Sequence, residues 1–181
     1  LSACTERIGF STQVLILPQR QTALVAKQAA CLDVLSGGRF RFGIGIGWNE
    51  AEYTSLNENF KNRGQRSVEQ IEVMKALWSN QHATFDGKWH HLDDLGINPL
   101  PLSRSIPLWF GGHKDATLRR IAKYGDGWIM IAWSPGDEAL LHFETLRNYV
   151  HKEGRNAEDV GIEVWVSASG SFTTLPRPTS M

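Results

Sequence analysis

Strand-like and helix-like segments alternate along the chain, and this alternation restricts the possible folds more than any other feature of the sequence. Apolar segments that suit β-strands occur at 7–17, 39–47, 107–112, 125–133 and 161–168. Segments with apolar residues at helical spacing follow the first four of them, at 21–36, 66–78, 115–124 and 139–153. Parallel strands are joined through right-handed helical crossovers. The sequence therefore predicts an α/β fold with a parallel sheet.

Two closures suit such a sheet, an eight-stranded barrel and an open doubly wound sheet, and the periodicity does not choose between them. A complete barrel takes about 250 residues, whereas this chain has 181. We therefore expect residues 1–168 to form one domain that holds part of a barrel. The last stretch, 169–181, contains Ser, Thr and Pro without periodicity and is expected to be a disordered tail.

The charge balance limits the classes of partner. The chain has 19 Lys and Arg residues and 19 Asp and Glu residues, so it lacks the long-range attraction of proteins that bind nucleic acid or anionic membranes. Its longest apolar run, 128–133, is far shorter than the roughly 18 residues of a membrane span. Cys4 and Cys31 have no metal-binding spacing, and no secretory leader is recognisable. We expect a cytoplasmic protein that binds neither nucleic acid nor membranes.

Three glycines alternate with isoleucines in the second predicted strand, at positions 43, 45 and 47. Alternate residues of a strand lie on opposite faces, so one face of this strand is bare backbone. The bare face could leave room for a planar ring at the mouth of a barrel, where such folds place their active sites. It could equally let a helix approach the sheet closely. The spacing is not a GxGxxG dinucleotide fingerprint, because the third glycine comes one position too early.

Polar residues follow this strand directly. The Asn49 amide can offer both a donor and an acceptor to a cofactor, and the Glu50 carboxylate can accept from hydroxyl groups. The alternative is that Asn49 caps the loop and Glu50 is solvated. The connection at 48–65 is long, which is typical of a functional segment. We expect it to form a wall of a site.

A second pair of glycines stands between a predicted strand and its helix. Gly111 and Gly112 would leave backbone N–H groups open at the helix N-terminus, where a phosphate can bind, and His113 or Lys114 could add charge. The alternative is an ordinary strand–helix turn in which Asp115 is the N-cap.

Other features suggest structure rather than chemistry. The segment 83–92 is expected to form a hairpin. The "WHHLDD" segment that overlaps it lacks metal-ligand spacing, and its adjacent histidines would point to opposite faces, so we expect no metal site. At the start of the helix at 66–78, the arginines are expected to cap it and to pair with Glu69 at the surface.

Three longer stretches, 15–53, 63–78 and 98–129, together resemble the luciferase-like flavin- or deazaflavin-dependent oxidoreductases, the superfamily that includes bacterial luciferase. The resemblance runs in order from about Thr5 to about Ala168. It implies an α/β fold of the (β/α)₈ TIM-barrel type, incomplete here, with about the third to the seventh strand present. The resemblance places the catalytic residues of relatives on the first strands, outside this sequence, so none is assigned.

The resemblance also implies an activity. We expect a flavin- or deazaflavin-dependent oxidoreductase that transfers a hydride to or from a small organic substrate, with the deazaflavin coenzyme F420 or FMN as cofactor. The "ILPQRQ" and "GWNEAEY" stretches favour the deazaflavin. One alternative is a two-component FMN-dependent monooxygenase that uses dioxygen and a flavin reductase partner. Another is an inactive fragment that binds a cofactor.

The resemblance assigns roles to particular residues. Thr12 and Val14 lie where relatives approach the ring with their backbone, often at a bulge with a non-prolyl cis peptide bond. The residues expected beside the cofactor are Thr12, Val14, Gly45, Gly47, Asn49 and Glu50, with Gly111, Gly112 and His113 at its phosphate. An incomplete barrel also exposes unpaired sheet edges, so we expect self-association or a homo-oligomer.

Overall fold

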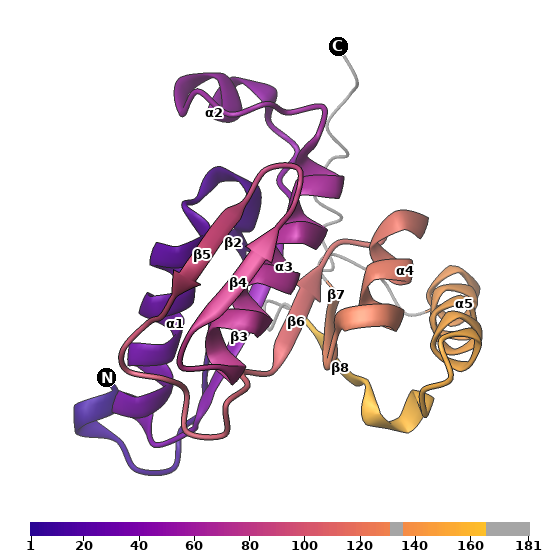
Figure 1. Ribbon diagram of the computed structural model, residues 1–181. Coiled ribbons are helices and arrows are strands. Elements are labelled where there is room, and N and C mark those ends of the chain that lie inside the picture. The colour runs from indigo at the N-terminus through magenta and orange to yellow at the C-terminus, as the bar shows by residue number, and fades with distance from the viewer. Residues whose placement is uncertain (131–135, 166–181) are drawn as a thin grey trace. The chain divides into compact units, whose positions relative to one another are not determined.

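Strand β3 (Phe40–Gly45) organises the first part of the chain in the computed structural model (Figure 1). The structure describes residues 1–130 and 136–165. They divide into two compact units, one of residues 1–108 and one that begins at Trp109. The predicted tail at 169–181 and the end of the last predicted strand, 166–168, lie outside the described residues.

Two short strands pair with β3 in parallel, β1 (Phe10–Ser11) and β2 (Leu15–Ile16). They replace the single strand that the sequence predicts at 7–17, so that prediction of one continuous strand is wrong. The chain is interrupted between them, and the Gln13–Val14 peptide bond is cis. This non-prolyl cis bond confirms what the family resemblance implies for the segment.

Two long helices of the first unit, α1 (Thr22–Ser36) and α3 (Arg63–Ser79), occupy the predicted segments. Their buried faces include the apolar residues Val25, Ala29, Ile71, Met74 and Leu77 together with polar residues such as those at 22, 33, 69 and 70. Trp78 joins the layers: its ring meets Phe42 of β3 edge-on at 6.5 Å between centroids, and its Nε1 donates to the Ala26 carbonyl at 2.9 Å. As predicted, α1 ends at Gly37, which has a left-handed φ of 67°.

The rest of the first unit consists of short elements. The predicted hairpin is present as antiparallel strands β4 (Ala83–Asp86) and β5 (His91–Leu95). The long connection after β3 contains a helix that the sequence analysis did not predict, α2 (Glu50–Ser55). Two 3₁₀ turns complete the unit, η1 (Ser2–Cys4) and η2 (Leu17–Gln19).

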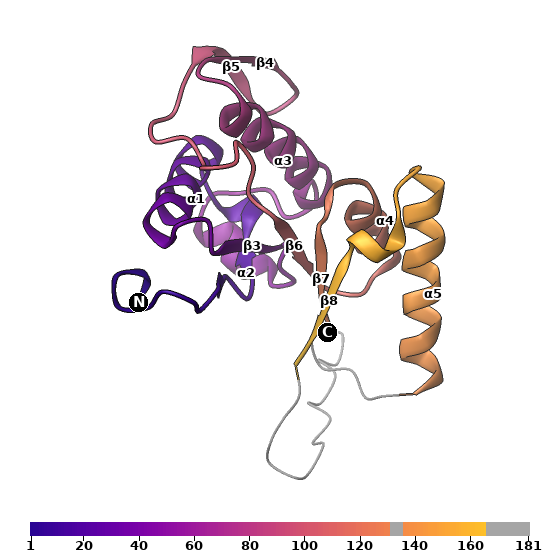
Figure 2. The ribbon, with the colours of Figure 1, turned by 90° about the horizontal axis from the view of Figure 1, so that it is seen from below.

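The second unit contains three parallel strands in the order β6 (Leu108–Gly111), β7 (Gly127–Met130) and β8 (Gly161–Val164). Helices α4 (Asp115–Tyr124) and α5 (Asp137–Lys152) lie side by side (Figures 1 and 2), and η3 (Ala157–Asp159) leads into β8. All three strands and both helices begin within predicted segments or two residues before them. None of the helices in the described residues is long and apolar enough to span a membrane.

Trp109 of β6 fills space that glycines leave on β7, its neighbour, and on β8, the strand beyond β7. A Cβ atom built on Gly127 would lie 2.2 Å from Trp109 Cδ2, and one built on Gly161 would lie 2.6 Å from Trp109 Cη2. The indole therefore lies against the bare backbone of β7 and β8, and this layer of the sheet has no room for a larger residue at either glycine.

Arginines close the ends of two helices. Arg39 donates to the Ser36 carbonyl at 2.5 Å and to the Ile8 carbonyl at 2.6 Å, which ties the end of α1 to the segment before β1. Arg155 donates to carbonyls near the end of α4, among them Ala122 at 2.8 Å and Gly125 at 2.8 Å. A positive charge at a helix C-terminus stabilises the helix dipole and satisfies its terminal carbonyls.

Candidate cofactor site

The end of β3 lies against the segment that carries the cis peptide bond. A Cβ atom on Gly45 would lie 2.8 Å from Val14 Cγ2. Val14 thus occupies the space that the missing side chain leaves, and the close neighbour of Gly45 is a strand segment. The alternative of a helix approaching the strand is not what the structure shows at this glycine. Residues 14–16 and 45–47 are all half-buried, so this wall of backbone and apolar side chains is partly open to solvent.

Position 47 requires glycine for two reasons, its backbone conformation and its close neighbours. Its φ of +66° is left-handed, a conformation that side chains rarely adopt. A Cβ atom there would also lie 3.0 Å from Ile16 Cγ2 and 3.4 Å from Tyr53 Cε2. Gly47 therefore lets the chain leave β3 closely packed between β2 and α2.

Thr12 connects the interrupted strand to β3. Its hydroxyl donates to the carbonyl of Gly43 at 2.7 Å, and Gly43 itself is buried. The Thr12 side chain thus holds the segment before the cis bond against the middle of β3. Its predicted contact with a cofactor stays a prediction.

Asn49 is the N-cap of α2. Its Oδ1 accepts from the Ala51 N–H at 3.1 Å, and its Nδ2 donates to Glu52 Oε1 at 3.3 Å. The capping role that the sequence left open as an alternative is therefore present. Glu50 is exposed in the first turn of α2, where an acid interacts favourably with the helix dipole.

An Asn49→Ala variant is expected to unfold at lower urea concentration, with a loss of about 1 kcal/mol, because the first turn of α2 loses its cap. Asn49→Asp keeps an acceptor at the cap and is expected to lose less than half of that. Urea unfolding followed by circular dichroism measures both variants. Equal losses in the two variants would show that the cap does not stabilise the fold.

Tyr53 packs beside the candidate site, and the sequence analysis did not identify it. Its side chain is fully buried, and its hydroxyl donates to the Ile46 carbonyl at 2.5 Å. Burial raises the pKa of Tyr53 to about 12, so the phenol stays a neutral donor at physiological pH. Because Ile46 lies between the two glycines of the wall, Tyr53 fixes the backbone at this point. The signal was available: Asn49 and Glu52, three residues apart, form a capping pattern that predicts α2.

The predicted phosphate-binding turn lies in the second unit. Gly111 is the last residue of β6, and Gly112 has a φ of +105°. The Gly112 carbonyl accepts from Trp128 Nε1 at 2.7 Å, so the turn is anchored to the buried indole of β7. The His113 ring lies 6.4 Å from the ring of His142 on α5, measured between centroids.

The predicted N-cap of α4 is wrong by one position. The cap is Lys114, and Asp115 is the first helical residue. The Asp115 carboxylate accepts from the Tyr149 hydroxyl and, at 2.8 Å, from Arg119 Nε. These two hydrogen bonds lower the pKa of Asp115 and turn the acid toward α5, away from the backbone N–H groups of the turn.

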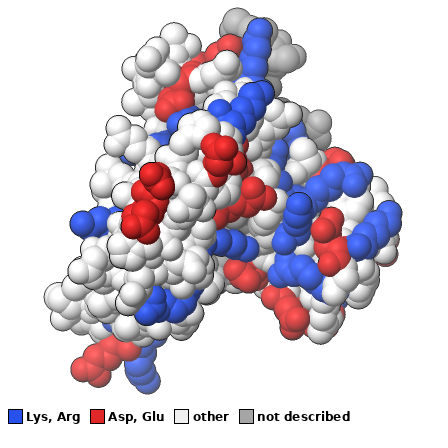
Figure 3. Space-filling view, in the orientation of Figure 1, with Lys and Arg blue, Asp and Glu red and all other residues white. Residues whose placement is uncertain are grey.

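Some charged residues elsewhere form ion pairs, such as Arg119 with Asp115 and Arg147 with Glu158. Basic and acidic side chains are interspersed over the face shown in Figure 3. Arg66 forms an ion pair with Glu58, so the predicted surface pair with Glu69 is wrong, because Glu69 is buried against the hairpin. The adjacent histidines do point apart: His90 contacts Glu69, and His91 contacts Asp86 at 2.5 Å. Across the described ranges no cluster of His, Cys, Asp or Glu could hold a metal ion.

A pocket of about 240 Å³ lies elsewhere, between α5, η3 and β8. It is lined mainly by apolar side chains, among them Phe143, Leu146, Val150 and Ile162. None of the residues that the sequence predicts as cofactor contacts lines this pocket, so it is separate from the candidate site.

The sequence matches known proteins over most of its length. The family described as "Luciferase-like monooxygenase" matches residues 1–173. An uncharacterised protein of Mycobacterium tuberculosis, Rv0940c, is 40% identical over 155 residues, which are 84% of this chain and 53% of that protein. Pyrimidine monooxygenase RutA of a Bradyrhizobium species is 34% identical over 174 residues, 91% of this chain and 46% of RutA. The chain thus spans about half the length of these relatives.

Solved structures share the fold. An F420-dependent secondary alcohol dehydrogenase in complex with an F420-acetone adduct matches 90% of this chain and 50% of its own, with a TM-score of 0.78 and 24% identity. Riboflavin lyase RcaE, with modified FMN and riboflavin, matches 90% of this chain and 42% of its own, with a TM-score of 0.81 and 16% identity. These likenesses confirm the predicted luciferase-type TIM-barrel fold, of which the chain represents about half.

Proposed function

The chain belongs to the luciferase-like monooxygenase family, and on that premise we propose that it forms part of an oxidoreductase that uses a flavin or a deazaflavin. The proposed reaction is hydride transfer to or from a small organic substrate, and the proposed cofactor is F420 or FMN. F420 is supported by the F420-dependent alcohol dehydrogenase structure and FMN by the riboflavin lyase structure.

The observation that carries the proposal is the wall made by Val14, Gly45 and Gly47. The wall consists of apolar side chains packed on the backbone of Gly45 and Gly47, it is half-buried, and it lies at the carboxyl end of a parallel strand. Barrel enzymes place their active sites at that end. Such a surface suits one face of a flat aromatic ring, so the residues present fit the cofactor.

When bound, the cofactor supplies the hydride donor or acceptor, and the protein orients it. In this proposal Val14 and Ile16 provide an apolar surface for the ring and keep water from that face. Gly45 and Gly47 keep the wall thin, and Tyr53 holds the carbonyl of Ile46 in place.

Other predicted residues take polar roles in the proposal. Asn49 can spare the N–H of its amide that does not contact Glu52, and Glu50 offers a carboxylate in the same turn. In the second unit, the turn of Gly111 and Gly112 with His113 precedes α4, whose terminal N–H groups favour an anion such as a phosphate.

Cofactor titration tests the proposal. Oxidised FMN and F420 are each titrated with the chain, and their fluorescence is followed. We expect one of them to be quenched with saturation, and the preferred cofactor distinguishes the two enzyme classes. Absence of saturable quenching by either cofactor would contradict the proposal. The Gly9→Ala variant serves as control, because a Cβ atom there meets only the Arg39 carbonyl oxygen at 3.6 Å, an ordinary contact.

A second candidate function is an FMN-dependent monooxygenase that uses dioxygen and receives reduced FMN from a flavin reductase. It is supported by the 34% identity to RutA, whose name describes a pyrimidine monooxygenase. Preference for FMN over F420 in the titration would favour this candidate. Preference for F420 would favour the hydride-transfer enzyme.

A further inference from the structure

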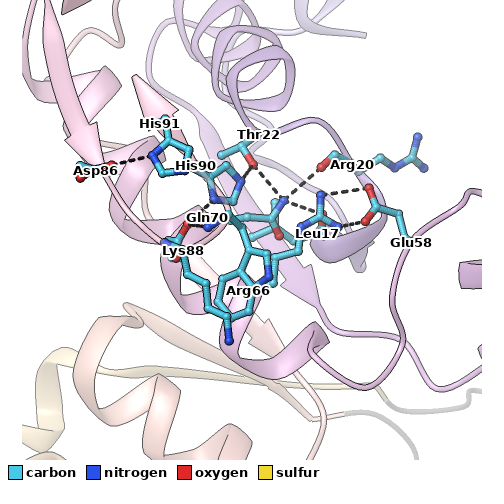
Figure 4. Close-up of polar contacts among 12 residues, drawn as sticks. Leu17, Arg20, Thr22, Glu58, Arg66, Gln70, Asp86, Lys88, His90 and His91 are labelled. Atoms are coloured by element: carbon cyan, nitrogen blue, oxygen red, sulfur yellow. Dashed lines mark hydrogen bonds and ion pairs between the residues drawn. The ribbon is translucent and has the colours of Figure 1, made fainter. Parts of the chain in front are cut away.

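Side chains from three distant segments form a chain of hydrogen bonds beneath the hairpin (Figure 4). His90 Nδ1 contacts Glu69 Oε1 of α3 at 2.8 Å. His90 Nε2 contacts Thr22 Oγ1, at the start of α1, at 2.6 Å. Thr22 Oγ1 also accepts from Gln70 Nε2 at 3.0 Å. No sequence pattern predicted this cluster, and the proposed function does not use it.

The donors and acceptors in this series of hydrogen bonds can be assigned by starting from Glu69 and from Gln70. Glu69 also accepts from the backbone N–H groups of Lys88 at 2.9 Å and Trp89 at 2.7 Å. Burial alone would raise the pKa of Glu69, but the hydrogen bonds from His90, Trp89 and Lys88 outweigh it and lower the pKa. Glu69 is therefore a carboxylate that only accepts, so His90 Nδ1 carries a proton.

The contact between Gln70 and Thr22, at the other end of the hydrogen-bond series, determines whether His90 Nε2 donates or accepts. Gln70 Nε2 donates to the Thr22 oxygen, which leaves the Thr22 hydroxyl proton for His90 Nε2. In this arrangement His90 donates from Nδ1 to Glu69 and accepts at Nε2 from Thr22. The contacts of His90 with Glu69 and Thr22 each have one donor and one acceptor in this arrangement, while the two protons of Gln70 Nε2 are shared among Thr22 Oγ1 and two backbone carbonyls.

Gln70 links the chain to the wall of the candidate site. Its Nε2 also lies 3.3 Å from the Leu17 carbonyl and 3.1 Å from the Arg20 carbonyl, the two ends of the turn that follows β2. Arg66, one helical turn before Gln70, donates to the Pro18 carbonyl in the same turn at 2.6 Å. The turn begins directly after Ile16, which packs against Gly47.

The hairpin is shaped to admit the carboxylate. A Cβ atom on Gly87 would lie 2.6 Å from Glu69 Cδ, so only glycine leaves room for Glu69 at the tip of the hairpin. The position of His90 at the base of β5 is thereby fixed relative to α3.

A hydroxyl, an imidazole and a carboxylate in this order resemble a nucleophilic triad, but the geometry does not suit catalysis. Thr22 is only 5% exposed, and its oxygen already accepts from Gln70. A substrate carbonyl could not reach the hydroxyl. The arrangement instead suits a structural role in which each group orients the next.

We infer that His90 is a positioning residue, held by Glu69, that locks Thr22 and the turn at 17–20 and so fixes the wall formed by Val14 and Ile16. The link from this lock to cofactor binding rests on the proposed function. The positioning of Thr22 and of the turn at 17–20 by His90 does not rest on the proposed function, because all of these contacts lie within the protein.

Hydrogen exchange on the chain of residues 1–181 tests the lock without any cofactor. His90→Asn keeps a donor for Glu69 but cannot reach Thr22, and Thr22→Val removes the hydroxyl while keeping its shape. In both variants the amides of Ile16 and Arg20 are expected to exchange at least tenfold faster, while core amides of α3 such as Met74 keep their rates. His91→Asn is the matched control, because His91 lies on the exposed face of the hairpin, and Thr22→Ser should restore slow exchange.

Two outcomes of the exchange experiment would overturn the inference: unchanged rates at Ile16 and Arg20, or equal acceleration throughout α3, which would indicate general destabilisation. Imidazole ¹⁵N shifts of the unsubstituted chain provide a second readout, with a protonated Nδ1 and an unprotonated Nε2 expected for His90. The reverse tautomer would also overturn it. A tenfold loss of cofactor affinity in His90→Asn is expected where the unsubstituted chain binds. If that chain binds no cofactor, the proposed function fails and the exchange result still decides on the lock.

Discussion

Gly47→Val is expected to lower the free energy of unfolding by about 3 kcal/mol and to abolish saturable cofactor binding. The left-handed φ of +66° at this position costs a residue with a side chain about 1–2 kcal/mol, and a β-branched residue more. The added methyl groups must also displace Ile16 or Tyr53, and overpacking of this kind costs about 1–3 kcal/mol. Ile16 belongs to the wall and Tyr53 holds the Ile46 carbonyl, so the shape of the wall changes as well.

The measurement is urea unfolding of Gly47→Val together with the fluorescence titration. Gly47→Ala is expected to lose about half as much stability, because alanine has the cost of the left-handed φ but overlaps with fewer neighbouring atoms than valine. Gly9→Val is the matched control, since Gly9 lies outside the wall and has no left-handed φ. If Gly47→Val were as stable as the Gly9 variant and bound cofactor normally, Gly47 would not shape the site.

Gly127→Ala is expected to destabilise the second unit by about 3 kcal/mol, at the upper end of overpacking costs. The new methyl group would lie 2.2 to 2.5 Å from three atoms of the Trp109 indole. The ring lies over the paired backbones of Gly127 and Gly161, so it cannot move away from Gly127 without losing its contact with Gly161. Gly161→Ala is expected to cost somewhat less, because its nearest indole atom is 2.6 Å away.

A double-mutant cycle isolates this contact. Trp109→Leu removes the indole, and in that background Gly127→Ala should cost less than 1 kcal/mol, so the coupling energy is about 2 kcal/mol. Thermal and urea unfolding supply the four stabilities. Additive losses in the double variant would show that the indole does not occupy the space beside Gly127.

The periodic parts of the fold could be predicted from the sequence because local patterns determine them. The helices α1 and α3 follow their apolar spacing, and Gly37 ends α1 as expected. The strand at 7–17 could not be predicted correctly. It is interrupted where Val14 packs into the space beside Gly45, and these two residues lie 31 positions apart in the sequence. Strand propensity does not contain that information.

The candidate site could be predicted in part. The spacing of the glycines in β3 indicated that one face of this strand lacks side chains, and the structure shows Val14 and Ile16 packed on Gly45 and Gly47. The partner of Glu69 was predicted wrongly. Its partner is His90, which lies 21 residues later in the sequence and is brought next to Glu69 by the hairpin. Asn49 can be predicted as a cap only if α2 is predicted first, and α2 is predictable only when Asn49 and Glu52 are considered together.

In the proposed function a flat cofactor lies against the wall of Val14, Gly45 and Gly47. Amide spectra of the ¹⁵N-labelled chain, recorded while FMN or F420 is added, test this most directly. We predict the largest shift changes at these three residues and at Asn49, saturating together with one dissociation constant. Changes confined to the pocket between α5 and β8, around Leu146 and Ile162, would contradict the account, as would no change at either glycine.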